Sequence, residues 1–420
     1  MFASLRVADF RYLFFGTFAG HIGFWMWIVG QGWLAFELTQ SATFLGAVQA
    51  ATAVPSLLLM LPSGVLADRW DRRAMIFYSN VGLTVASGLL MLSVGLELAQ
   101  PWHLIVLGAL TGAAAAVNMP ARQAMGPQLA GRELTSNAVA LSSLSFNASR
   151  VLGPALAGLL IWVVGLFGCF VAQTLLLGLS AVLTGMIRTR GVPEHGGQER
   201  SVTQNLVDGI RYSRRDPVLR GCVIVSLLHN LFGLTYSHLM PVFAGSVLQV
   251  GGAGLGTLLT AVGIGSAVGS VAAVLLSQHS QKGLIMFLTS LAFGGGILLF
   301  SLSASLPLVL GALVALGCAH AVASIANHTI LNLASPDAYR GRVNSIFIFT
   351  WNIAPLAALP AGWLADQIGA PLTVAISGVL TIVTMAAAAV WLTAVRSFRD
   401  ADYRFGSPRG HAEPSASVSS

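Results

Sequence analysis

Charged side chains are scarce in this sequence. Only 9% of its 420 residues are Asp, Glu, Lys or Arg, whereas 55% are hydrophobic. Soluble domains carry about a quarter charged residues, so a water-soluble protein of this composition would lack the polar surface that it needs. Lipid is the other available solvent, and an apolar run of roughly 20 residues spans its hydrocarbon layer. The scarcity of charge therefore excludes a soluble globular protein and predicts an integral membrane protein.

Cysteine is also scarce, and the three that are present lie in or beside apolar runs. They are expected to be small buried hydrophobes, without a disulfide framework or a metal site. The glycine-rich stretch 251–256 has no following Lys, so a tight turn explains it better than a nucleotide loop. No nucleophile–base pair or ligand cluster stands out, and we therefore expect no metal, no cofactor and no enzymatic activity. No signal-peptide cleavage site follows the first apolar run.

Twelve apolar spans follow one another along the chain. The only long polar segment, 189–216, separates the sixth span from the seventh, and its second half predicts an amphipathic helix on the membrane surface. We therefore predict an all-α membrane protein with twelve transmembrane helices in two six-helix bundles, residues 1–188 and 217–396. Residues 189–216 would form a cytoplasmic linker, and the Ser-, Pro- and Gly-rich residues 397–420 a disordered cytoplasmic tail. The spans are predicted at 12–36, 44–67, 74–96, 102–121, 137–163, 167–188, 218–246, 254–277, 283–303, 306–331, 343–365 and 371–395.

The distribution of Lys and Arg orients these spans. If the N-terminus is cytoplasmic, all but one of the 22 basic residues fall on the cytoplasmic side, and the exception is Arg150 inside the fifth span. Cytoplasmic links carry this excess in membrane proteins. The sequence therefore predicts a multi-pass protein of the bacterial cytoplasmic membrane with both termini cytoplasmic. The formal charge of +7 is then a topological signal, so nucleic acid is not an expected partner.

The two halves share a pattern. An Arg shortly before an Asn, followed by Pro and Gly, occurs at 132–158 and again at 340–362. Repeated halves joined by a long linker are typical of transporters, which bind substrate near the membrane midplane between them.

The loop between spans two and three has five charges in the six residues 68–73. Such a short charged loop between apolar runs must lie at a membrane surface. Its pattern resembles the loop signature of the major facilitator superfamily, carried here by Gly64, Asp68, Arg69, Arg72 and Arg73. Asp replaces the usual Gly at position 71, and this variant resembles the drug and siderophore exporter branch, which includes enterobactin and macrolide exporters. The resemblance covers nearly the whole chain and implies the major facilitator fold, usually a monomer.

The resemblance implies a gating role for Asp68. Its carboxylate can accept hydrogen bonds from the N-terminal amides of a facing helix, where the helix dipole also favours negative charge. The resemblance places that helix at span eleven, so the bond would close the cytoplasmic side. Gly64 would allow a close helix approach, and Arg69, Arg72 and Arg73 would hold the loop at the headgroups. The equivalent loop of the second half, 277–282, lacks the acid, so the latch is expected to be one-sided.

Span five contains Gly153, Pro154 and Gly158, which resemble the antiporter signature of the superfamily. Ser149 and Ala157 replace two glycines of that signature. Small residues four apart permit tight helix contact, and Pro154 would bend the helix. The motif favours export over import, while ordinary small-residue packing also explains it.

Spans one, four, seven and ten line the central cavity in this family. Polar groups are costly in hydrocarbon and should face a wet cavity or each other. The polar residues of these spans together predict a substrate lining, although each one alone also fits a hydrogen-bonded structural role. The residues of this lining, with Arg150 from span five, are His21, Trp25, Gln31, Asn118, Arg150, His229, Asn230, His320, Asn327 and His328.

No Asp or Glu lies deep in any predicted span, so Arg150 and the histidines have no acid beside them. Such a cavity suits neutral or anionic ligands better than polycations. Proton coupling would depend on Asp68 or on a cavity His, whose ordinary pKa is near 6.5. We therefore predict a secondary active exporter of drug-like compounds or siderophores, working by alternating access and proton antiport, as in multidrug efflux. An uncoupled facilitator or channel, and a receptor that kept the transporter fold, are the alternatives.

Overall fold

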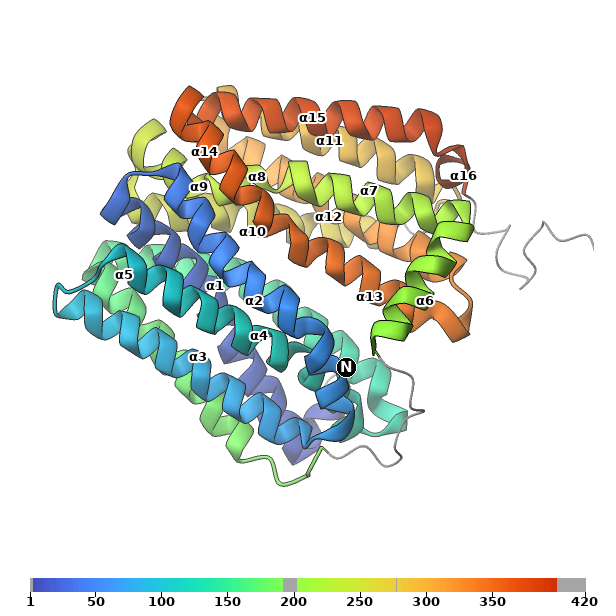
Figure 1. The fold of residues 1–420 in the computed structure, drawn as a ribbon, viewed down its shortest axis with the longest axis horizontal. Helices are drawn as coiled ribbons and strands as arrows, with labels where there is room; N and C mark the ends of the chain where they lie inside the picture. The colour runs from blue at the N-terminus through green and yellow to red at the C-terminus, as the bar shows by residue number, and fades with distance from the viewer. Residues whose placement is uncertain (1–2, 192–201, 277, 399–420) are drawn as a thin grey trace, which may run out of the picture.

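The computed structural model describes residues 3–191, 202–276 and 278–398. Within these ranges it describes the backbone alone for a few positions, namely 61, 65, 68, 132, 202–208, 337 and 338. Every regular element in the described part is a helix, so the predicted all-α architecture is confirmed. Figure 1 shows the helices arranged as two sets.

The first set of helices runs from the N-terminus to residue 185. It comprises η1 (Ala3–Arg6), α1 (Ala8–Thr39), α2 (Ala42–Arg69), α3 (Arg72–Gly95), α4 (Pro101–Ala130), η2 (Arg132–Leu134) and α5 (Thr135–Gly185). Helix α6 (Val202–Arg215) follows alone. The second set comprises α7 (Pro217–Gly233), α8 (Thr235–His238), α9 (Met240–Val242), η3 (Phe243–Val247), α10 (Gly251–Leu276), α11 (Lys282–Leu302), α12 (Leu306–Ala334), α13 (Asp337–Ile353), η4 (Ala354–Ala357), α14 (Ala358–Ile368), α15 (Ala370–Trp391) and α16 (Thr393–Arg396).

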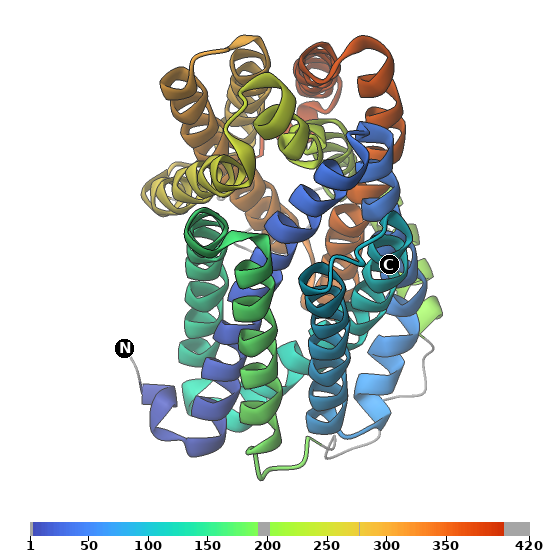
Figure 2. The ribbon, with the colours of Figure 1, turned by 90° about the vertical axis from the view of Figure 1, so that its left-hand side faces the viewer.

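Eleven helical segments of the described chain are long and apolar enough to cross a membrane. One of them, α5, has 51 residues and contains Gly165 in a left-handed conformation, with φ at 74°. Such a φ suits glycine, which has no Cβ to clash. Figure 2 shows the two legs of α5 side by side, joined by a turn. Helix α5 therefore accounts for both of the spans predicted at 137–163 and 167–188.

Carboxylates set the start of two helices. Asp71 accepts a hydrogen bond from the backbone N–H of Arg73 and caps α3. Asp216 accepts from the N–H groups of Val218 and Leu219 and caps α7, whose first residue is a proline. A side-chain acceptor at this position satisfies amides that have no partner inside the helix. These charged caps explain why two helices begin just after polar turns.

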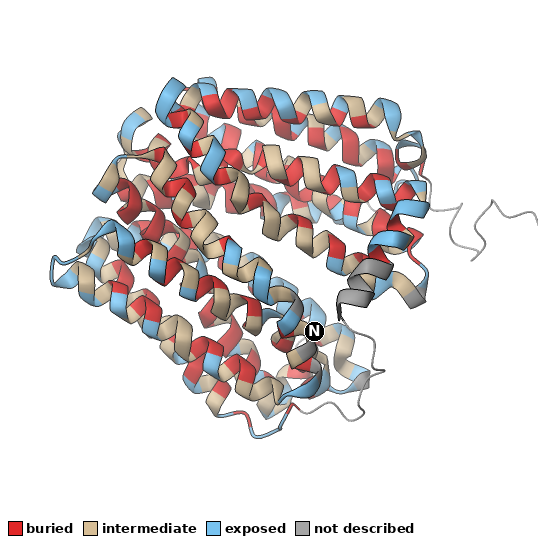
Figure 3. Cartoon of the chain, in the orientation of Figure 1, coloured by how far each residue is buried: buried red, intermediate tan, exposed pale blue. Residues whose placement is uncertain are grey.

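Each set of helices packs mainly within itself. In the first set α1 and α3 lie against α5, and α2 lies against α4. In the second, α10 and α11 lie against α12, and α15 lies against α7 and α11. The division into bundles at 1–188 and 217–396 stays a prediction, and residues 399–420 of the expected tail lie outside the described residues. Figure 3 shows buried residues on helix faces turned toward other helices and exposed ones outside.

The two ends of the molecule differ in how the sets meet. We call the end that carries η1, α6 and the 69–73 loop the linker end, and the opposite end, with residues 40–41 and 369, the far end. Toward the far end the sets touch through glycines: a Cβ added at Gly256 of α10 would lie 2.4 Å from the Cα of Gly158 of α5. The helices of the two sets diverge toward the linker end (Figure 1).

Helix α6 lies at the linker end and contacts both α2 and α13. The ring of Tyr212 stacks on that of Tyr339 with centroids 4.3 Å apart. Burial, with nearby Asp216 and Tyr339, raises the pKa of the Tyr212 phenol. Part of the apolar face expected at 201–215 therefore packs on protein, and its contact with the membrane surface stays a prediction.

Replacing Gly265 of α10 by Ala should destabilise the protein. The added Cβ would lie 2.1 Å from the carbonyl oxygen of Val314 in α12, a backbone atom that cannot turn away. Overpacking of this kind costs about 1–3 kcal/mol. Gly311→Ala is the matched control, because a Cβ there meets nothing within 4 Å and alanine is the better helix former. Thermal unfolding in detergent should show a lower midpoint for Gly265→Ala alone, and equal midpoints would contradict this packing.

Candidate functional site

Two neighbouring helices of the first set form a wall of aromatic and basic groups. The guanidinium of Arg150 on α5 lies over the ring of Trp25 on α1, 5.8 Å from its centroid. One turn away, Phe146 makes edge contacts with Trp25 at 6.2 Å and with His21 at 5.3 Å. Gly153 permits this closeness, since a Cβ there would lie 2.4 Å from the Cβ of Trp25. The predicted residues His21, Trp25 and Arg150 are thus brought together.

Arg122 of α4 extends this wall. The predicted fourth span ends at residue 121, so Arg122 is expected among the cytoplasmic basic residues, and its place relative to the membrane stays a prediction. The helix runs on to Ala130, and Arg122 Nη1 lies 3.3 Å from His21 Nε2. Its Nη2 donates to Asn80 Oδ1 at 3.4 Å. Arg150 is therefore not the sole basic residue whose side chain lies among the helices of the first set.

Three predicted cavity residues form hydrogen bonds within their own set of helices. Asn118 donates to Asn80 Oδ1 at 2.9 Å and Gln31 donates to the carbonyl of Leu104 at 3.3 Å, both inside the first set. Asn327 donates to the carbonyl of Cys222 at 3.2 Å in the second set. All three are buried. Their side chains act as ties between helices, which is the structural role that each residue alone also fitted.

The second set contributes a buried histidine pair. His229 Nε2 on α7 lies 2.9 Å from His320 Nδ1 on α12, and both rings pack on Phe293. Trp351 of α13 covers His320 at 5.6 Å. Asn230, beside this pair, donates to Ser226 and Thr350. Asn230 therefore joins α7 to α13, and the histidines form a small aromatic cluster.

His328 lies apart from this cluster. It is exposed on α12 and pairs with Asn344 Oδ1 at 3.0 Å, next to α13. The structure therefore does not bring it together with His229 of α7 and His320, which are buried; His320 lies about two helical turns earlier on α12.

The wall of the first set meets the histidine cluster of the second set at Arg150, and we call these two groups the walls. Arg150 is close enough to Tyr236 and His320 of the second set to interact with both electrostatically. Among the described side chains, no carboxylate contacts the guanidinium of Arg122 or Arg150. Several buried polar atoms of the walls also have no hydrogen-bond partner. They are His21 Nδ1, Trp25 Nε1, Arg122 Nε and His320 Nε2. The arrangement offers positive charge, which suits an anionic ligand.

The charged loop is fixed mainly by protein groups. Arg72 donates through Nε to the carbonyl of Ala67 at 2.9 Å, and Arg73 Nη2 donates to the carbonyl of Gly185 at 2.6 Å. These bonds join the loop to the ends of α2 and α5, whereas Arg69 is exposed. Arg72 and Arg73 thus hold the loop through protein groups, and anchoring of the three arginines at the lipid headgroups stays a prediction.

The other residues with a predicted gating role differ in how closely they approach a neighbouring helix. A Cβ at Gly64 would meet nothing within 4 Å, so the close helix approach expected there is absent in this conformation. The Asp68 side chain lies outside the described residues. Gly158 does make a close contact, because its Cβ would lie 2.9 Å from the carbonyl of Ala253 in α10. Pro154 is buried one turn before it on the same helix. The motif of span five thus lies where the two sets touch.

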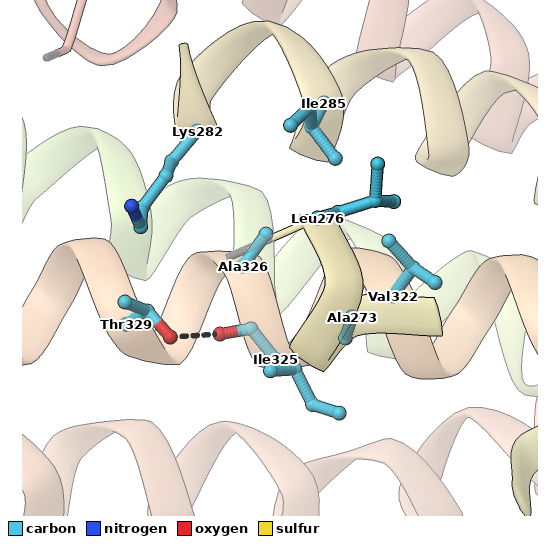
Figure 4. Close-up of a pocket in the computed structure, with 8 residues that line it drawn as sticks. All are labelled: Ala273, Leu276, Lys282, Ile285, Val322, Ile325, Ala326 and Thr329. Carbon is cyan, nitrogen blue, oxygen red and sulfur yellow. Dashed lines mark hydrogen bonds between the residues drawn. The ribbon is translucent and has the colours of Figure 1, made fainter. Parts of the chain in front are cut away.

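A separate small pocket lies at the linker end between α10, α11 and α12 (Figure 4). Its volume of about 40 Å³ suits one or two waters. Apolar side chains dominate it, with Lys282 and Thr329 at one side; the Thr329 hydroxyl donates to the carbonyl of Ile325 at 2.8 Å. This pocket is too small for a siderophore or drug and is no part of the candidate site.

Comparisons with known proteins agree on one kind of molecule. A family model described as "Transmembrane secretion effector" matches residues 1–415. The chain is 26% identical over 380 residues to the staphyloferrin A transporter of Staphylococcus aureus, covering 89% of this chain and 93% of that one. It is 28% identical over 374 residues to the enterobactin exporter EntS of Shigella boydii, covering 86% and 80%.

Solved structures extend the comparison to the fold. A POT family transporter in complex with 5-aminolevulinic acid gives a TM-score of 0.74 at 12% identity, covering 92% of this chain and 96% of that one. The nucleoside transporter NupG gives 0.69 at 13% identity, covering 93% and 100%. At such identities the likeness shows the fold alone.

Replacing Asn80 by Ala should destabilise the first set of helices. Asn80 Oδ1 accepts from both Asn118 and Arg122, so its loss removes an acceptor from each and leaves Asn118 with only the Ile76 carbonyl at 3.4 Å. Each such loss costs about 1–3 kcal/mol. Asn147→Ala is the control, because Asn147 is exposed and bonds only to the Ser143 carbonyl of its own helix. Thermal unfolding in detergent should separate the two variants, and a control as unstable as Asn80→Ala would refute the role of Asn80.

Proposed function

Because the chain belongs to the transmembrane secretion effector family, within the major facilitator superfamily, we propose that it exports an anionic small molecule of the siderophore class. The resemblance seen in the 64–73 loop is thereby confirmed, and so is the fold. The protein is a multi-pass membrane transporter that acts on a small-molecule substrate, and not an enzyme. The proposal adds the substrate charge and the direction of movement.

The observation that carries the proposal is the unpaired positive charge of the walls. Arg122 and Arg150 lie among helices without a carboxylate contact in the described part of the chain. A charge held inside a membrane protein without a partner is costly, and a bound anion would offset that cost. Trp25 and Phe146 add flat surfaces for aromatic or planar parts of a ligand. Two similar proteins carry the names of siderophore transporters.

Export by proton antiport is the direction and coupling that we propose. The protein would act as a monomer in the bacterial cytoplasmic membrane with both termini in the cytoplasm. The small-residue motif of α5 supports export, because it lies at the contact between α5 and α10. Protons would bind at Asp68 in the loop or at the histidine pair, since no acid lies deep in any predicted span. Multidrug efflux is the broader form of the same activity.

Transport in inverted membrane vesicles tests this function. The vesicles would be offered a catecholate siderophore, a macrolide and a cationic dye, each with and without an imposed pH gradient. Saturable uptake of the siderophore that exceeds uptake of the dye supports the proposal. Movement of the dye alone contradicts the anionic preference, and flux that does not saturate indicates a channel.

Arg150→Gln should lower transport of the siderophore about tenfold or more. A hydrogen bond to a charged group contributes about 1.5–3 kcal/mol, and 1.4 kcal/mol corresponds to tenfold. Arg220→Gln is the matched control, because Arg220 is an exposed arginine at the start of α7. Transport rates in vesicles, normalised to the amount of folded protein, measure the effect. An Arg150→Gln variant with unchanged transport would remove Arg150 from the substrate site.

Asp68→Asn should abolish the response to the pH gradient. Asparagine keeps the size of the side chain but cannot take up a proton. Uptake that still rises with the gradient in Asp68→Asn would move coupling to another group, whereas wild-type uptake indifferent to the gradient would favour an uncoupled carrier.

A further inference from the structure

Asp366 joins the two sets of helices at the far end. It is the last acidic residue of α14, and its carboxylate accepts three hydrogen bonds from the start of α2. Oδ1 accepts from the backbone N–H of Ala42 at 2.7 Å. Oδ2 accepts from the N–H of Thr43 at 2.9 Å and from the hydroxyl of Ser41 at 2.8 Å. The carboxylate thus caps a helix that is more than 300 residues away in sequence and belongs to the other set.

The sequence around Asp366 repeats the sequence around Asp68. Residues 62–68 read Pro-Ser-Gly-Val-Leu-Ala-Asp, and residues 360–366 read Pro-Ala-Gly-Trp-Leu-Ala-Asp. Five of these seven residues are identical. The first copy ends α2 at the linker end, and the second ends α14 at the far end. Each acid is therefore near the last turn of its helix.

Helices α2 and α14 are packed backbone to backbone beside this cap. A Cβ at Gly362 would lie 2.1 Å from the carbonyl of Ala42, and a Cβ at Gly46 would lie 2.3 Å from the carbonyl of Ala358. Gly64, the counterpart of Gly362 in the first copy, has open space around it. In this structure the second copy of the motif therefore packs against α2, whereas Gly64 of the first copy contacts no neighbouring helix.

We propose that Asp366 is a far-end latch that alternates with Asp68. With the far end closed, Asp366 caps α2; when the far end opens, α14 leaves α2 and those hydrogen bonds break. The acid of the first copy would then reach the start of α13 at the linker end. In this proposal the counterpart of Asp68 is on the other helix of the same pair and not in the 277–282 loop, so the latch would be two-sided and not one-sided as expected.

Asp366 is a positioning residue in this proposal and touches no substrate. The proposal rests on alternating access as part of the proposed function, but its test measures conformation and needs neither a known substrate nor transport. A failure of the transport assay therefore leaves this test intact.

The test uses pulsed electron paramagnetic resonance on the full chain in lipid nanodiscs, with Cys169, Cys222 and Cys318 replaced by Ala. One spin-label pair, at Leu98 and Leu302, spans the sets at the far end, where both side chains are exposed. A second pair, at Trp70 and Ser280, spans them at the linker end. The two distances should change in opposite directions when the protein switches.

Asp366→Ala should lower the ratio of far-end-closed to far-end-open molecules by about fivefold or more, the size of a lost helix cap. Asp366→Asn should give a smaller decrease, because one amide oxygen can still accept. Asp68→Asn should change the ratio in the opposite direction.

Asp9→Ala is the matched control. Asp9 also accepts hydrogen bonds from two backbone amides, those of Arg188 and Thr189, but these lie in its own set of helices. Its loss should lower thermal stability and leave both distance distributions unchanged. The proposal is overturned if Asp366→Ala leaves the distributions as in the wild type, or if Asp9→Ala shifts them equally. If Asp366→Ala does not fold, the distance distributions of Asp366→Asn serve as the test. Distributions unchanged from the wild type in that variant would overturn the proposal.

Discussion

Hydrocarbon offers no hydrogen-bond partner, and this constraint governs the whole molecule. Backbone groups must be satisfied inside each segment, so the described chain is helical throughout its regular elements. Charged side chains are restricted to the ends of helices or to positions where other protein groups surround them. Asp71 and Asp216 follow the first course by capping helices, and Arg122 and Arg150 follow the second. The composition of the sequence and its polar clusters have this common cause.

Helices in lipid must also attract one another without the help of water. Glycine meets this need, because it lets two backbones approach until dispersion contacts and weak polar contacts act directly. In this protein such contacts occur inside each set, as at Gly265 on Val314, and between the sets, as at Gly158 on Gly256. The contacts inside a set can be permanent. Alternating access, as we propose it, would break the contacts between the sets, which lie toward one end.

The helices were predictable from the sequence because hydropathy and the Lys and Arg pattern are local signals. The partner of a polar side chain was not, since it depends on which neighbour meets that helix face. Gln31, Asn118 and Asn327 illustrate this, as each forms a hydrogen bond to another helix of its own set. Arg122 follows the predicted end of span four at residue 121, whereas α4 continues for two more turns, so its neighbours His21 and Asn80 were not foreseen. Asp366 had a visible signal in the repeat at 360–366, but only the antiparallel pairing of α2 and α14 gives that repeat its meaning.

In the proposed latch, the helix pair with an acid at the end of each helix is a two-state element. Helices α2 and α14 run in opposite directions, so the two acids lie at opposite ends of the pair. If the sets move as stiff bodies, closing one end separates the other, and the two caps cannot form together. Each state then has one cap formed and one lost, which keeps the two states close in energy. A transporter needs such a balance, because a state that was much more stable would trap the cycle. The sequence repeat is therefore best understood as a requirement of motion, since a static bundle would gain as much from a single cap.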